Sequence, residues 1–145
     1  MGLKRDKYDE AISNLVRLRS NFTCERCGEQ DEQGQITFKS QTIHCSHFNG
    51  RGSGITARYD TDNCRALCAS CHSIVEHKPG VHTKLLQEIL GERGFELMEE
   101  RCHGVRKMYK HDKEEMLKHY RSEFNRLKEE RMNGNVNYIE VVNYF

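Results

Sequence analysis

Apolar and polar positions alternate with a helical period near the start of the chain. Within residues 4–20, apolar side chains recur three and four positions apart and charged residues fill most positions between them: Tyr8, Ala11, Ile12, Leu15 and Val16. Side chains with this spacing share one face of an α-helix. The pattern therefore predicts an amphipathic helix over residues 4–20 that packs on the core.

The same period returns in the second half of the chain. Leucine and isoleucine side chains precede Gly91 and further apolar residues follow it, which predicts two short helices with a break at the glycine. A longer helix is predicted over residues 112–132, because four apolar side chains form one stripe: Met116, Tyr120, Phe124 and Leu127. The weak alternation over residues 137–145 fits an edge strand, a segment that docks on a partner, or a frayed end.

The centre of the chain has a different pattern. Residues 35–48 are rich in β-branched and aromatic side chains, which predicts a strand or hairpin. Asp62 is a suitable N-cap for a helix from Asn63 to about Lys78, which Pro79 then ends.

The length of 145 residues allows one domain and no second independent core. It divides into the first helix of residues 4–20, a core of residues 21–80, a helical region of residues 81–133 and a tail of residues 134–145. Only 36% of the residues are hydrophobic and 31% are charged, so the apolar core is small. A bound metal would help to stabilise such a core.

Cysteine usage and charge narrow the class of protein. The seven cysteines are an odd number, no apolar secretory segment begins the chain, and no apolar run approaches the roughly 18 residues of a membrane span. We therefore expect a soluble, cytoplasmic protein whose cysteines bind metal or are buried, because disulfide frameworks belong to secreted chains. The formal net charge is only +1, so any nucleic-acid surface must be a local patch.

The most specific motif is a pair of CxxC sequences, Cys24-x2-Cys27 and Cys68-x2-Cys71. Four thiolates in two such pairs can complete the tetrahedral shell of a structural zinc ion. The 40 residues between the pairs exceed the usual span of about 15 to 20, so another element is inserted there. The remaining cysteines are expected to be buried as small apolar side chains: Cys45, Cys64 and Cys102.

Histidines in and beside this insertion suggest hydrolytic chemistry. Phosphodiester hydrolysis needs a water deprotonated near neutral pH and a cation that stabilises charge on the phosphate. His47 is the candidate base, because imidazole titrates near neutral pH. His72, anchored by Cys71, is the candidate ligand of the cation, and the amide of Asn63 can hold the loop geometry through backbone hydrogen bonds. The other histidines lack a motif and are expected at the surface: His82, His103, His111 and His119.

The order His47, Asn63 and His72, interlaced with the CxxC pairs, resembles the HNH family of nucleases. The segment from Asp62 to His72 is similar to the family's asparagine-to-CxxC-His segment. The resemblance implies an α+β fold with a small ββα-metal core, a structural four-cysteine zinc site, and flanking N-terminal and C-terminal helices. It assigns His47 as the base, Asn63 as the loop-fixing residue and His72 as the metal ligand.

Within that family the chain looks closest to the NinG (Rap) recombination nucleases of lambdoid phages. Two motifs carry the likeness, and the layout of residues 85–130 is similar: His44-x-x-His47-Phe48 and Arg58-Tyr59-x-x-Asp62-Asn63. The resemblance implies a phage-encoded or bacterial metal-dependent DNA endonuclease that acts on branched recombination intermediates such as Holliday junctions.

The chain departs from the family at one position. Many HNH nucleases carry an aspartate ligand directly before the base histidine, where this chain has Ser46. His44, a backbone oxygen or water could replace it, and His77 is another candidate ligand. The catalytic cation is left open between Mg²⁺, Mn²⁺ and other divalent metals, because imidazole ligands favour the later transition metals.

Three arginines are candidate contacts for DNA phosphates, because they lie near the predicted site: Arg51, Arg58 and Arg65. Each could instead pair with an acidic neighbour. The expected partner is DNA, including four-way junctions, and symmetric cutting of a junction would require a homodimer.

Two other functions fit the same sequence. A zinc-stabilised DNA-binding or adaptor module could have lost cleavage together with the aspartate. A zinc-stabilised helical protein could use its C-terminal helix for dimerisation, with no role for DNA.

Overall fold

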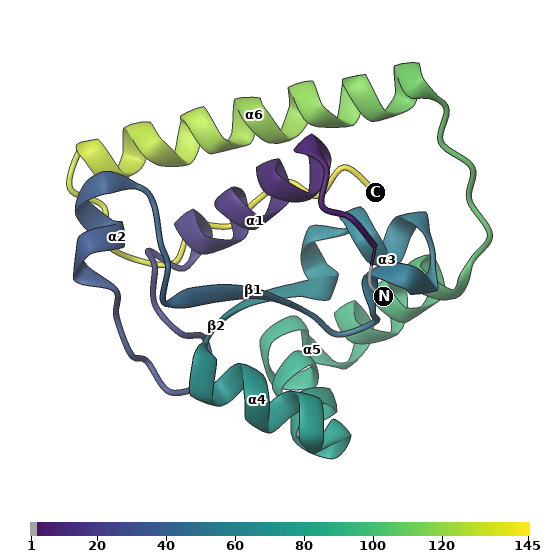
Figure 1. The fold of residues 1–145 in the computed structure, drawn as a ribbon, viewed down its shortest axis with the longest axis horizontal. Coiled ribbons are helices and arrows are strands. Elements are labelled where there is room, and N and C mark those ends of the chain that lie inside the picture. Colours follow the sequence, from purple (N-terminus) through teal and green to yellow (C-terminus); the bar gives the residue numbers. More distant parts are fainter. Residues whose placement is uncertain (1–2) are drawn as a thin grey trace.

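The computed structural model describes residues 3–145 and shows an α+β fold around a two-stranded antiparallel sheet (Figure 1). Strand β1 (Ile43–His47) pairs with strand β2 (Cys64–Cys68). Helix α1 (Lys7–Arg19) packs on one face of this sheet, and helix α4 (Ala69–His77) packs on the other. The α+β class expected from the sequence is therefore confirmed.

Helix α1 begins with a capping box. The carboxylate of Asp6 accepts hydrogen bonds from the backbone amides of Tyr8 and Asp9, and the carboxylate of Asp9 accepts one from the amide of Asp6. The apolar face of α1 is fully buried between the sheet and helix α6 (Lys110–Met132), which runs alongside α1 (Figure 1). The helices predicted over residues 4–20 and 112–132 are therefore confirmed.

The hairpin predicted over residues 35–48 is wrong in its first part. Residues Glu32–Thr37 form helix α2, in which the Asp31 carboxylate caps the first turn by accepting from the Gly34 amide at 3.0 Å. Phe38 ends the helix in the left-handed conformation, with φ of 60°. The Asp31 cap favours a helix over a strand here. The β-branched residues of the segment remain exposed, so pairing in a sheet would bury none of them.

The helix predicted to begin at Asn63 begins at Ala69 instead. Asp60, and not Asp62, caps a short 3₁₀ turn η2 (Thr61–Asn63), and the residues that follow form β2. All five residues of β2 are buried, so the strand lacks the alternation of polar and apolar residues by which a half-exposed strand is recognised.

Helix α5 (Pro79–His103) is interrupted at Gly91, whose φ of +74° is open to glycine but costly for other residues. The predicted break is therefore confirmed. Its second segment is held to the core by Arg101, whose guanidinium donates to Asp60 at 2.7 Å and to Asp62 at 3.0 Å. No helix within residues 3–145 is long and apolar enough to cross a membrane.

The connection between the strands contains a 3₁₀ turn η1 (Arg51–Ser53) and the short helix α3 (Ile55–Tyr59). Helix α3 contacts both α1 and α5. The segment is therefore packed against the rest of the protein rather than extending as a free loop.

After α6 the tail runs back along the core as an extended segment. It forms no strand with the sheet within residues 3–145. The Ile139 amide donates to the Arg19 carbonyl at 3.1 Å, and the Arg131 guanidinium donates to the Leu18 and Arg19 carbonyls. These contacts fix the tail against the core. Of the three alternatives for residues 137–145, the structure therefore contradicts the edge strand and the frayed end, and docking on a partner stays a prediction.

A charged cluster lies in the interior beside the sheet. The Glu25 carboxylate pairs with Arg65 at 3.1 Å and with Arg19 at 3.7 Å, and it accepts a hydrogen bond from the Ala66 amide. Arg65 also donates to the Tyr138 hydroxyl in the tail. The cluster joins the loop after α1, strand β2 and the tail through one set of buried charges.

Candidate metal centres

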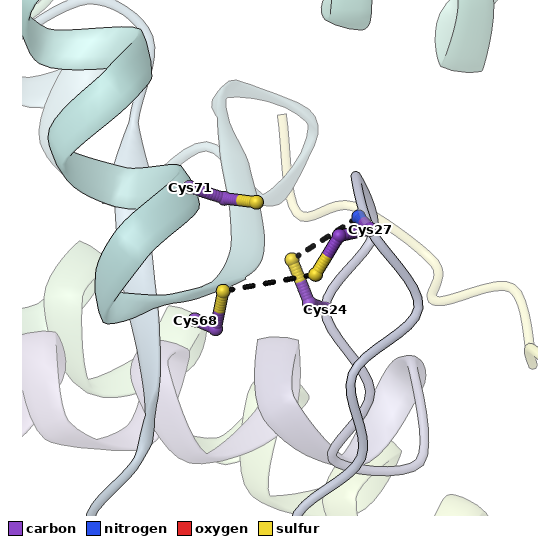
Figure 2. Close-up of side chains that lie close together, drawn as sticks. All are labelled: Cys24, Cys27, Cys68 and Cys71. Atoms are coloured by element: carbon purple, nitrogen blue, oxygen red, sulfur yellow. Dashed lines mark hydrogen bonds between the residues drawn. The ribbon is translucent and has the colours of Figure 1, made fainter.

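The two CxxC pairs meet in the folded chain. Cys24 and Cys27 lie in the loop after α1, Cys68 ends β2, and Cys71 lies in the first turn of α4. Their sulfur atoms lie within 4.8 Å of one another and point toward a common centre (Figure 2). The Cys27 and Cys68 sulfurs are 3.8 Å apart, and zinc–sulfur bonds of about 2.3 Å at tetrahedral angles separate sulfurs by about 3.8 Å. This four-cysteine site can therefore hold a metal ion such as zinc.

Polar groups around the four-cysteine site favour the thiolate form of Cys24, whereas burial raises the pKa of Cys68 to about 12. Burial opposes ionisation of Cys24, but backbone amides of Cys27, Cys68 and Arg26 outweigh it and lower the pKa of this thiol to about 7. The Cys27 amide donates to the Cys24 sulfur, and the Arg26 guanidinium donates to the Cys71 sulfur, each at 3.5 Å. Deprotonated sulfur is the form that binds metal.

A second group of candidate ligands lies between β1 and α4. The Nδ1 atoms of His44 and His72 are 3.0 Å apart, and the Nε2 atom of His72 is 3.1 Å from the Glu76 carboxylate. A carboxylate that accepts from Nε2 leaves Nδ1 free to bind a cation. Two nitrogen ligands with bonds of about 2.1 Å lie about 3.4 Å apart at a tetrahedral metal and about 3.0 Å apart at right angles, and 3.0 Å is also the length of a hydrogen bond between the two rings. We call His44 and His72 the histidine site.

His82 is buried, and the expectation that it lies at the surface is wrong. Its side chain is on α5 and packs edge-to-face against Phe48, with ring centroids 4.9 Å apart, and only 7% of the residue is exposed. Burial, and to a lesser degree the charge of His72, lower the pKa of His82 to about 4 against the opposing effect of Glu76. Its Nε2 atom has no hydrogen-bond partner within residues 3–145. Sequence reasoning missed both His82 and Glu76, because neither belongs to a motif.

His47 lies on the other face of the sheet. Side chains alternate along a strand, so Cys45 and His47 point toward α1 whereas His44 points toward α4. Donor atoms of Cys45, His47 and Cys64 lie within 4.8 Å of one another, and we call these residues the thiol–imidazole cluster. The structure thus divides the expected histidine centre into two groups.

Two of the three cysteines outside the CxxC pairs belong to this cluster. A hydrogen bond with Cys64 lowers the pKa of Cys45 to about 5 against the effect of burial, and the pKa of Cys64 is raised in return. Cys64 and Cys102 are buried as expected, whereas Cys45 is only half-buried.

Asn63 holds the chain that follows β1. Its side chain is fully buried, donates to the backbone carbonyls of Asn49 and Ala57 at 2.9 and 2.7 Å, and accepts from the Asn49 amide at 2.8 Å. Its own carbonyl accepts from the Phe48 amide. Both ends of the amide therefore bond backbone groups of the connection between the strands.

Several predicted site residues have partners within the protein. The Nδ1 atom of His77 contacts the Ser73 carbonyl of its own helix at 2.8 Å, and this residue is exposed. Arg58 donates to Asp9 at 2.6 and 2.9 Å, and Arg51 lies 3.3 Å from the same carboxylate. Arg65 is only 1% exposed in the charged cluster with Glu25. In this structure these arginines hold the fold together rather than presenting free cations at the surface.

No known protein family, curated protein or solved structure matches this chain. The resemblance to HNH nucleases therefore rests on the motif residues alone.

Proposed function

We propose that this protein is a metal-dependent DNA endonuclease of the HNH type, built on a ββα-metal core and acting on branched recombination intermediates. The observation that carries the proposal is the meeting of His44 and His72, which come from β1 and α4 and face each other at 3.0 Å. The choice of DNA, and of branched DNA in particular, rests on the resemblance of the motifs to the recombination nucleases.

The alternation of the strand supports His44 as the replacement for the absent aspartate. His44 and Ser46 are two residues apart on β1, so their side chains point to the same face. The family's acidic ligand would occupy that face at position 46. His44 offers a ligand on the same face two residues earlier, and its Nδ1 atom lies 3.0 Å from that of His72.

His47 is the general base in this proposal. Its Nε2 atom lies 3.2 Å from the Arg58 carbonyl. A carbonyl can only accept a hydrogen bond, so Nε2 carries the proton and Nδ1 is the basic atom. The Asp9 carboxylate holds the Arg58 side chain, and Asn63 holds the neighbouring Ala57 carbonyl. These bonds fix the orientation of the imidazole before a substrate binds.

The histidine site would bind a transition-metal ion in preference to Mg²⁺, because imidazole nitrogen suits the later divalent metals. A cation held there would stabilise negative charge on the scissile phosphate and the leaving oxygen. Burial lowers the pKa of His44, with further lowering by His72 and Arg17, so the ring is neutral and able to bind metal near neutral pH.

A non-catalytic DNA-binding or adaptor module is the second candidate. The absence of an aspartate at Ser46 and the placement of His47 on the opposite face from the histidine site favour it. Such a protein would keep the four-cysteine site and bind branched DNA without cutting it.

Cleavage of a supercoiled plasmid and of a synthetic four-way junction tests the proposal. We expect cutting with Mn²⁺, weaker cutting with Mg²⁺, and none after the added metal is chelated. His47→Ala should lower the rate by at least about 100-fold, whereas the matched change at an exposed histidine, His103→Ala, should leave it unchanged. Junction binding without cleavage under any metal would establish the adaptor instead.

A further inference from the structure

We propose that the thiol–imidazole cluster of Cys45, His47 and Cys64 is a third metal site, which takes a borderline or soft divalent cation such as Zn²⁺. It is separate from the four-cysteine site and lies on the opposite face of the sheet from the histidine site.

The register of the sheet brings the three donors together. Cys45 and His47 are two residues apart on β1 and therefore share a face, and Cys64 of β2 lies directly opposite His47. Side chains paired in this way have Cβ atoms about 5 Å apart. A cation with bonds of about 2.0 to 2.3 Å fits between them, as the 4.8 Å limit on the donor separations also indicates.

The donor set selects the class of metal. Two thiolates and one imidazole suit zinc, cobalt and cadmium, and they exclude Mg²⁺ and Ca²⁺, which require oxygen ligands. Three protein ligands leave the fourth tetrahedral position for water. The ring nitrogen of His47 that the Arg58 carbonyl does not engage is available for the metal.

A metal fits this cluster better than a disulfide does. Cys45 lies opposite Ala66, so Cys45 and Cys64 are diagonal neighbours in the sheet. Diagonal positions are about 7 to 8 Å apart, whereas the Cα atoms of a disulfide are usually about 4.4 to 6.8 Å apart. A cation can span the longer separation without movement of the backbone.

The surroundings allow a cation to enter and remain. Cys64 is fully buried, whereas Cys45 and His47 are half-buried. The positive charge of Arg17 lies near Cys45. Two thiolates and a divalent cation carry no net charge together, so the occupied cluster does not repel this guanidinium.

Occupation of the cluster would inhibit the proposed nuclease, because the metal would take the lone pair that His47 needs as a base. This consequence rests on the proposed function, whereas the site itself does not. Zinc beyond the amount that fills the four-cysteine site should therefore inhibit cleavage, and Cys45→Ser should relieve that inhibition.

Cobalt spectroscopy tests the site without reference to activity. The full-length protein, with zinc in the four-cysteine site, is titrated with Co²⁺ under anaerobic conditions. A sulfur-to-cobalt charge-transfer band is expected, and the histidine site cannot produce it because it has no sulfur. Cys45→Ser and Cys64→Ala should abolish the band, whereas Cys102→Ala and His44→Ala should keep it.

Three results would overturn the site. They are a wild-type protein with no such band, a band that persists in Cys45→Ser, and a disulfide between Cys45 and Cys64 found by peptide mapping of the cobalt-treated protein. Circular dichroism of each variant shows whether it is folded. If Cys64→Ala does not fold, Cys45→Ser still tests the site, because Cys45 is only half-buried. A cobalt band, together with no DNA cleavage by the cobalt-free protein in Mn²⁺, would keep the site and reject the nuclease.

Discussion

His44 and His72 face each other across the space between β1 and α4, with their Nδ1 atoms 3.0 Å apart, and Glu76 holds the far nitrogen of His72. Loss of such a carboxylate typically lowers metal affinity 10-fold to 100-fold. Glu76→Gln should therefore weaken Mn²⁺ or Co²⁺ binding by about that factor, as measured by isothermal titration calorimetry. The matched change at an exposed position of α5, Glu88→Gln, should have no effect. Equal affinities of wild type and Glu76→Gln would contradict the assignment.

Removal of metal from the four-cysteine site should unfold the core. The site joins the loop after α1 to the end of β2 and the start of α4, so its loss frees three elements at once. Cys68→Ser should lower the free energy of unfolding by about 4 kcal/mol or more. Thermal unfolding followed by circular dichroism measures this, and a strong chelator should mimic it reversibly. A Cys102→Ala control should unfold nearly as wild type does and should retain its zinc.

Substitution of Asn63 should loosen the connection between the strands. Asn63→Asp keeps an oxygen for the Asn49 amide but removes the donor that satisfies the Asn49 and Ala57 carbonyls. Each buried group left unsatisfied costs about 1 to 3 kcal/mol. Urea denaturation should show a loss of about 2 kcal/mol or more, against almost none for the exposed Asn125→Asp. A loss confined to cleavage, with unchanged stability, would show that Asn63 does not clamp the backbone.

His82 should make stability depend on pH. Its pKa is about 4 in the folded protein, against about 6.5 when exposed, because burial disfavours the charged ring. Above about pH 6.5 both states are neutral and the full stability is present. As the pH falls toward about 4, the unfolded chain binds a proton that the folded chain does not, so stability falls by about 1.4 kcal/mol per pH unit.

The comparison of wild type with His82→Leu isolates this effect from other titrating groups. The difference between their free energies of unfolding in urea should change with pH below about 6.5 and be constant above it. The exposed His103→Leu should show no such change. A difference that does not vary with pH would mean that His82 is protonated equally in both states.

Periodicity predicts the helices of this protein well because α1 and α6 each bury a single face. It fails for β2, since a strand buried on both faces has no alternating pattern, and for α2, where the Asp31 cap outweighs β-branched composition. The CxxC spacing predicts the four-cysteine site because two such pairs place four thiolates where they can bind one tetrahedral metal ion.

The order of the histidines along the chain could not show that His44 and His47 lie on opposite faces of the sheet. This placement follows from strand alternation, and β1 was predicted only as part of a longer hairpin. His82 follows His72 along the chain, past the end of α4 and into the first turn of α5, and only the packing of α5 against Phe48 brings it inward. Arg65 is likewise buried because it pairs with Glu25. The two residues are far apart in the sequence, so no local pattern predicts this ion pair.

The tail makes the last step of folding depend on contacts between distant parts of the sequence. The Ile139 amide donates to the Arg19 carbonyl, and Arg65 donates to the Tyr138 hydroxyl 73 positions further along the chain. Contacts of such long range form late, because the entropy of closing the loop opposes them. A folding intermediate should therefore assemble α1, the sheet and the metal centres, and hold metal, before it acquires the protease resistance of the native protein.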